Sequence, residues 1–157
     1  MRILIISDTH DKTDNIEILK KKIGKIDLII HCGDGTSDFD FASDFLKAKI
    51  CGVRGNSDII SRESSILNLN IEGKLIHIEH GDKLPLYSEL VLVQYAKDNG
   101  YDVILYGHTH VQKIINKDNV WIVNPGSLSR PHDGYPSYII MQTDGKGNFE
   151  FNGERII

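Results

Sequence analysis

Five short groups of metal-donor side chains are spread along this chain of 157 residues, and together they could hold a pair of divalent ions. At least four of the five groups come directly after a short apolar run. The groups are Asp8-Thr9-His10, Gly33-Asp34, Gly55-Asn56, His80-Gly81 and Gly107-His108-Thr109-His110. A mixture of carboxylate, amide and imidazole donors suits Mn²⁺, Fe²⁺, Co²⁺, Ni²⁺ or Zn²⁺. Two such ions roughly 3.5–4 Å apart form a clamp for displacement at phosphorus, so the pattern predicts phosphoryl chemistry.

Taken singly, most of these donors have ordinary structural explanations. Asp8 could cap a turn, Asp34 between two glycines could be a turn aspartate, and a lone histidine such as His80 at a strand end is more often structural than a ligand. His108 and His110 are more specific, because His-x-His after a strand presents two imidazoles to one side. Asp8 and His10 should also point the same way if the backbone between them stays extended. It is the joint occurrence of the five groups that favours metal binding.

Hydrophobic patterning predicts one mixed α/β domain that spans residues 1–157. The opening alternates buried strands with helices, whereas the second half is rich in β structure. We expect strands at 2–7, 27–32, 49–53, 66–71, 74–79, 103–106, 111–115, 120–123, 138–142 and 148–152. We expect helices at 14–23 with Asp14 as N-cap, from Ser37 or Asp38 onward, and at 88–98 before Asn99-Gly100. Loops that follow parallel strands meet at one sheet edge, where open α/β sheets place their active sites.

Bulk composition excludes some classes of partner. The formal net charge of −4 and the pI near 5.9 argue against nucleic-acid binding by charge, so a phosphate-bearing substrate would be attracted locally by metal ions. Cys32 and Cys51 have no CxxC partner and read as small buried hydrophobic residues in a reducing compartment. The apolar run at the start is too short for a signal peptide, and no run approaches a membrane span. We therefore expect a cytoplasmic protein without membrane contact; a homo-oligomer remains open.

Read in order, the motifs D-x-H, G-D, G-N-x-D, H-G, G-H-T-H and N-P-G-S resemble the signature of the calcineurin-like metallophosphoesterases. The resemblance extends from residue 1 to about residue 140. The small size and the N-P-G-S motif are most similar to the compact YfcE-type phosphodiesterases. This resemblance implies a four-layer αββα sandwich of two mixed β-sheets, with a dinuclear metal centre at the loops that follow strand C-termini.

The resemblance also implies a role for each donor. Asp8, His10 and His110 would hold the first metal, Asn56, His80 and His108 the second, and Asp34 would bridge the two. The cofactor would be two divalent ions, with Mn²⁺ the first expectation and Ni²⁺, Zn²⁺, Fe²⁺ or Co²⁺ the alternatives. The family mechanism is attack on phosphorus by a metal-bridging hydroxide. The catalytic set would then be Asp34, Asn56 and Asp58, with Asp58 orienting His10 or a nearby backbone amide.

Two positions depart from the family pattern. Many larger members have a histidine after the Gly-Asn pair, where it serves as general acid, and Ser57 stands in that place here. A serine hydroxyl is a weak acid, so the loss should show most on poor leaving groups. Arg130-Pro131-His132 replaces a Pro-Arg pair that related sequences often have. We expect Asn56, Ser57 and Arg130 to contact the substrate phosphate, whereas His132 reads as part of an exposed loop and His31 as buried.

Three functions fit these residues. The leading one is a metal-dependent phosphodiesterase acting on a small diester. The second is a non-catalytic interaction scaffold, like the retromer subunit that shares this small fold but has altered metal-site residues. The third is a phosphomonoesterase or nucleotide phosphatase, which the absence of the acid histidine disfavours. All seven expected metal ligands are present in this sequence, and their presence favours the enzyme over the scaffold.

Overall fold

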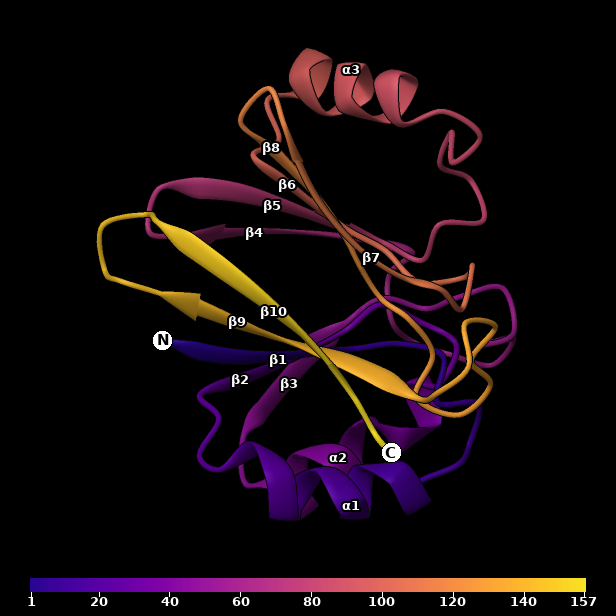
Figure 1. The fold of residues 1–157 in the computed structure, drawn as a ribbon. Coiled ribbons are helices and arrows are strands. Elements are labelled where there is room, and N and C mark those ends of the chain that lie inside the picture. Colours follow the sequence, from indigo (N-terminus) through magenta and orange to yellow (C-terminus); the bar gives the residue numbers. More distant parts are fainter.

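Two five-stranded sheets lie face to face in the computed structural model, which describes all 157 residues (Figure 1). The first sheet has the strand order β10-β9-β1-β2-β3 and the second β4-β5-β6-β8-β7. The strands of the first sheet are β1 (Arg2–Ile6), β2 (Leu28–His31), β3 (Lys49–Gly52), β9 (Ser137–Thr143) and β10 (Phe149–Arg155). Those of the second are β4 (Ile66–Ile71), β5 (Lys74–Glu79), β6 (Val103–Leu105), β7 (Gln112–Lys117) and β8 (Val120–Pro125). Both sheets are mixed, because three parallel strands in each pair with antiparallel neighbours.

Three helices cover the outer faces of the sheets. α1 (Asp14–Ile23) and α2 (Phe39–Leu46) pack on the first sheet, and α3 (Glu89–Asn99) packs on the second. The sequence of β1 is continuously apolar because both of its faces are buried. Ile3 and Ile5 enter the core between the sheets, whereas Leu4 and Ile6 face α1 and α2. A strand buried on both faces has no polar side to display. The predicted αββα sandwich is therefore confirmed.

The helix and strand ends correct two expectations. Asp14 is not the N-cap of α1; Thr13 holds that position without a side-chain hydrogen bond. The strand predicted at 111–115 continues to Lys117, because β7 and β8 are joined by the two-residue turn Asp118-Asn119, both residues having positive φ. Two-residue hairpin turns of this kind match the twist of the flanking strands. The hairpin at 66–79 and the helix before Gly100 lie where they were predicted.

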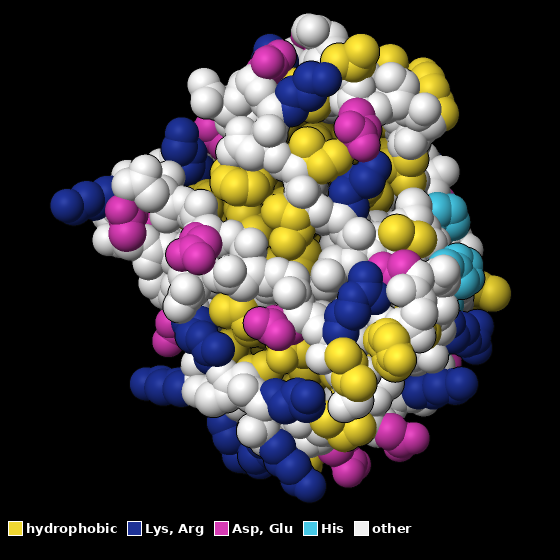
Figure 2. All heavy atoms as spheres, viewed as in Figure 1, with side chains coloured by type: hydrophobic (Ala, Val, Ile, Leu, Met, Phe, Trp, Pro, Cys, Tyr) yellow, Lys and Arg dark blue, Asp and Glu magenta, His cyan; other side chains and the backbone are white.

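The loops after β1, β2, β3, β5 and β6 crowd together on the right-hand side of Figure 1. Exposed histidine side chains gather at the same edge in the space-filling view (Figure 2).

Both cysteines are free thiols, and burial raises the pKa of Cys51 to about 11. None of the three helices is both long enough and apolar enough to cross a membrane. The cytoplasmic location stays a prediction.

Candidate metal centre

The loops that carry the donors have an unusual backbone. Asp8, His10, Asp34, His108 and His110 all have positive φ, between 46° and 65°. The extended backbone that would have let Asp8 and His10 point the same way is therefore absent, yet Asp8 Oδ1 and His10 Nε2 still lie 3.8 Å apart. Non-glycine residues adopt this conformation at a cost of roughly 1–3 kcal/mol each, and such strain clusters at functional sites. These loops are held in place by contacts elsewhere in the fold.

The first group of donors comprises Asp8, His10 and His110. Asp8 Oδ1 lies 3.0 Å from His110 Nε2 and 3.8 Å from His10 Nε2, and the two Nε2 atoms are 3.4 Å apart. Atoms that bind one ion at about 2.0–2.2 Å are separated by distances of this order. The three side chains thus form a compact cluster that could hold one metal ion.

The second group surrounds Asp34 and His80, whose Oδ2 and Nε2 atoms are 3.4 Å apart. His108 Nδ1 lies 3.1 Å from Asn56 Oδ1 at the same edge. Two carboxylates lie between the groups: Asp34 Oδ2 is 4.0 Å from His10 Nε2, and Asp8 Oδ1 is 4.0 Å from His80 Nε2. Five predicted ligands thus fall in two groups that could hold metal, and His108 and Asn56 lie beside His80. Ligation by all seven residues and the choice of Asp34 as the bridge stay predictions.

The burial and the hydrogen bonds of the donor side chains leave lone pairs available for a cation. Asp8 Oδ1 and His80 Nε2 are buried without a hydrogen-bond partner, which is costly unless another group satisfies them. His80 Nδ1 lies 2.8 Å from the Cys32 carbonyl oxygen, and His110 Nδ1 lies 2.7 Å from that of Arg130. A carbonyl only accepts, so each Nδ1 carries the proton and each Nε2 presents a lone pair to the site. These residues fit a bound metal ion.

The charges of the site shift the pKa values of its members. Burial raises the pKa of Asp34, but the His80 imidazole 3.4 Å away and the two hydrogen bonds from Ser57 outweigh burial, so the net pKa is lowered and the group is a carboxylate. The Asp8 carboxylate, whose Oδ1 lies 3.0 Å from His110 Nε2, is the main cause that raises the pKa of His110. Burial lowers the pKa of His10, and the positive charge of Arg130 acts in the same direction. Two carboxylates among imidazoles give the site the negative charge that a divalent ion would balance.

Asp58 connects two of the donor loops through hydrogen bonds to backbone N–H groups. It makes no hydrogen bond to a predicted ligand side chain. Its Oδ2 accepts from the N–H groups of Asp34 and Gly55, both at 2.8 Å. Its Oδ1 accepts from Gly35 at 2.9 Å and from Thr36 at 3.0 Å. The expected contact with backbone amides is present, whereas contact with His10 is not. In this geometry Asp58 is a positioning residue.

Ser57 contacts the carboxylate of Asp34 directly. Its N–H donates to Asp34 Oδ1 at 2.8 Å and its hydroxyl to Oδ2 at 2.7 Å. His132, expected to be an exposed loop residue, is exposed but has its ring centroid 4.6 Å from that of His110. Arg130 is near enough to His10 to affect its pKa. All three residues thus lie at the metal edge.

The turn formed by the N-P-G-S motif supports the donor loops, and Ser129 just after it was not singled out from the sequence. The hydroxyls of Ser127 and Ser129 both donate to the Asp8 carbonyl at 2.9 Å. Asn124 Nδ2 donates to the Gly107 carbonyl at 2.7 Å and so fixes the turn before His108. The N-P-G-S motif was the signal, since a tight turn after a strand can orient such groups.

A second network lies beneath the Asp8-Thr9-His10 loop. His31 Nδ1 accepts from the Gly33 N–H at 3.1 Å, so its Nε2 carries the proton and donates to Thr9 Oγ1 at 3.1 Å. Burial lowers the pKa of His31 to about 4, so the ring is neutral at pH 7. His31 is buried, as predicted, and links the first loop to the second.

Glycine is required where backbone and side chains of different loops meet. A Cβ on Gly55 would lie 2.1 Å from Asp34 Oδ1, and one on Gly107 would lie 2.0 Å from Ser7 Oγ. Neither distance is tolerable without movement of the loops. The glycines of the Gly-Asn and Gly-His motifs therefore permit the close approach of the donor loops.

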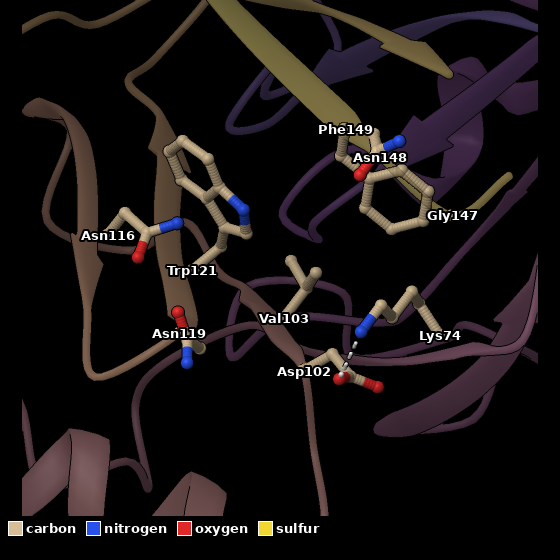
Figure 3. Close-up of a pocket in the computed structure, with 9 residues that line it drawn as sticks. All are labelled: Lys74, Asp102, Val103, Asn116, Asn119, Trp121, Gly147, Asn148 and Phe149. Atoms are coloured by element: carbon tan, nitrogen blue, oxygen red, sulfur yellow. Dashed lines mark hydrogen bonds and ion pairs between the residues drawn. The ribbon is translucent and has the colours of Figure 1, made fainter. Parts of the chain in front are cut away.

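The opposite end of the sandwich contains a different cavity of about 350 Å³ (Figure 3). Trp121 and Phe149 lie on two sides of it, and Lys74 pairs with Asp102 at 3.3 Å. It is lined by a single carboxylate and no imidazole. It therefore lacks the donor set that distinguishes the metal edge.

Residues 1–146 match the Calcineurin-like phosphoesterase superfamily domain. The chain belongs to this family. The predicted resemblance is thus confirmed, and the metallophosphoesterase assignment agrees with the Asp and His groups that could hold a metal ion.

Relatives of the chain include named phosphodiesterases. The chain is 32% identical to phosphodiesterase MJ0936 of Methanocaldococcus jannaschii, over 93% of this chain and 95% of that protein. The crystal structure of a predicted phosphoesterase from Streptococcus pneumoniae is similar with a TM-score of 0.77 and 25% identity, covering 98% of this chain and 88% of that one. Vps29 of Entamoeba histolytica, solved in complex with Zn²⁺, has a TM-score of 0.78 at 19% identity, covering 99% of both chains. The Vps29 likeness shows the fold alone.

Proposed function

We propose that this protein is a phosphodiesterase that works with two divalent metal ions. One observation carries the proposal: Asp8, His10, Asp34, His80 and His110 converge in two groups that could each hold a metal ion, and two of their buried atoms, Asp8 Oδ1 and His80 Nε2, have no hydrogen-bond partner in the protein. Bound there, the ions would supply positive charge at phosphorus and an activated water at neutral pH. Mn²⁺ is the first ion to test.

The side chains around the ions would orient the phosphate. Asn56 adds a neutral oxygen donor where another carboxylate would repel the substrate. Arg130, whose charge reaches His10, is placed to hold a phosphate oxygen by charge-assisted hydrogen bonds. Ser57 keeps Asp34 in position through two hydrogen bonds and leaves the leaving group without an imidazole donor. A diester with a good leaving group is the substrate that this arrangement favours over a monoester.

The scaffold function draws support only from the shared fold with Vps29. A scaffold has no need for two groups of converging metal donors or for strained loops that present them. The donor set therefore favours the enzyme.

The test is metal-dependent turnover. Metal-free protein should be loaded with Mn²⁺, Ni²⁺, Zn²⁺, Fe²⁺ or Co²⁺ in turn and assayed on bis(p-nitrophenyl) phosphate and p-nitrophenyl phosphate. We expect two ions per chain by mass spectrometry and faster turnover of the diester. His110→Ala should lose metal and activity, whereas Asp44→Asn, an exposed substitution on α2, should lose neither. Full retention of metal and activity by His110→Ala, or absence of turnover with every ion, would overturn the proposal.

A further inference from the structure

A cavity of about 610 Å³ lies beside the metal centre and is not explained by metal binding. Two of its lining residues directly follow predicted ligands in the chain: Asp11 follows His10, and Ser57 follows Asn56. Ser57 marks the boundary, because it lines the cavity while its hydroxyl donates to Asp34 Oδ2 at 2.7 Å. A group attached to a phosphorus held at the metals would reach this cavity directly. Its volume is within the ~300–1,000 Å³ range of small-molecule sites.

One wall of the cavity is apolar. Phe39, Ile59 and Ile60 line it, and the two isoleucines are the most exposed large hydrophobic residues of the chain, at 88% and 97%. No other part of the protein covers them. Their apolar surface would be removed from water by a ligand that packs against the wall, and that burial would favour binding.

The charges of the cavity select against anions. Four carboxylates line it (Asp11, Asp40, Asp58 and Glu63), against the single guanidinium of Arg62, so the formal balance is −3. The hydroxyls of Ser37 and Ser61 add neutral hydrogen-bonding groups. A second phosphate placed here would meet excess negative charge, and like charges brought together in a binding site are disfavoured. An uncharged group with an apolar face and hydroxyl or amide groups would be complementary.

The same charges decide which part of the substrate occupies the cavity. Negative charge develops on the leaving oxygen during the reaction, and the carboxylates would destabilise it there. The ester group retained on phosphorus carries no such charge. The retained group therefore suits the cavity, and the leaving group suits the open, solvent side.

Resting on the proposed phosphodiesterase activity, we propose that this cavity is a substrate subsite that binds the retained ester group. The group it takes is uncharged and about the size of a nucleoside, in preference to one that carries a further phosphate. The enzyme would then act on diesters with one bulky neutral organic substituent.

Three substrates with the same p-nitrophenyl leaving group test this proposal: methyl p-nitrophenyl phosphate, thymidine 5′-(p-nitrophenyl phosphate) and the 3′-phosphorylated form of the latter. We expect kcat/KM for the thymidine ester to exceed that for the methyl ester by roughly tenfold or more, the discrimination that apolar pocket contacts supply. The added 3′-phosphate should remove most of that gain.

Variants connect the preference to the cavity. The paired substitution Ile59→Ser and Ile60→Ser should bring the thymidine-to-methyl ratio toward one, and both positions are exposed enough to leave the fold intact. Tyr87→Ser, at 84% exposure and outside the cavity, is the matched control and should keep the ratio. Asp40→Asn with Glu63→Gln should raise kcat/KM for the 3′-phosphorylated substrate. A raised salt concentration should weaken the discrimination against that phosphate.

The outcomes separate the subsite from the activity. Equal kcat/KM for all three substrates in an active, metal-loaded enzyme would overturn the subsite and leave the phosphodiesterase intact. A ratio unchanged by the isoleucine substitutions would overturn it as well. Absence of turnover of even the methyl ester with every metal would instead remove the phosphodiesterase function and the subsite with it.

Discussion

Asp58→Asn should destabilise the protein and weaken its metal site, although Asp58 contacts none of the seven donor side chains. The wild-type carboxylate accepts four backbone N–H groups, two on each oxygen, at 2.8 to 3.0 Å. An asparagine retains one oxygen and turns an NH₂ donor toward the other two N–H groups. Two charge-assisted hydrogen bonds are therefore lost, and two backbone N–H groups are left facing the NH₂ group of the asparagine, which also donates.

Hydrogen bonds to a charged group are worth about 1.5–3 kcal/mol each, and the site is part-buried, so we expect a loss of roughly 2–4 kcal/mol in the free energy of unfolding. The loops that this carboxylate ties carry Asp34 and Asn56. Substitution of groups that orient metal ligands commonly lowers metal affinity by about 10–100-fold, so a fall of that size is expected here.

The assay is urea unfolding of the metal-free variant, followed by titration with Mn²⁺. Asp44→Asn, which makes the same chemical change on the exposed side of α2, is the control. A shift in unfolding midpoint no larger than that of the control would refute the hydrogen-bond reasoning. A destabilised variant with unchanged metal affinity would show that the tie between the loops does not position the ligands.

Three further predictions concern the other members of the site. Asp34→Asn should reduce occupancy from two metals to one or none and abolish most turnover; native metal content and rate in that variant would remove Asp34 from the bridging role. His31 has a folded-state pKa of about 4, below its usual 6.5, so stability is complete above pH 6.5 and is lost as pH falls toward 4, by up to about 3 kcal/mol. Urea unfolding of metal-free protein at pH 7 and pH 4.5 measures this loss, and His31→Gln should flatten it; an equal pH dependence in that variant would exclude His31 as its cause. Finally, with Ser57 in place of an acid, turnover should depend steeply on leaving-group pKa, and Ser57→His should gain most on alkyl leaving groups; a flat series in the wild type would show that another acid is already in place, with His132→Ala the variant to measure next.

The sequence by itself was sufficient to predict the helix and sheet layers of the fold. β1 and β2 are continuous apolar runs because each is covered by a sheet on one side and by helices on the other. The hairpin at 66–79 was predictable because alternation and a Glu-Gly turn are both local signals. The order of the strands was not predictable, because β9 pairs with β1 across more than 130 residues and no local pattern records that partner.

The types and spacing of the donors also predicted which residues meet at one edge. What only the tertiary structure decided is how they meet. The left-handed backbone of Asp8 and His10 is not a preference of those residues; it is imposed by bonds from distant segments, including those of Ser127 and Ser129 to the Asp8 carbonyl. The local sequence determines which backbone conformations are low in energy. A strained loop persists only when contacts from the rest of the fold hold it in place, and those contacts exist only after the chain has folded.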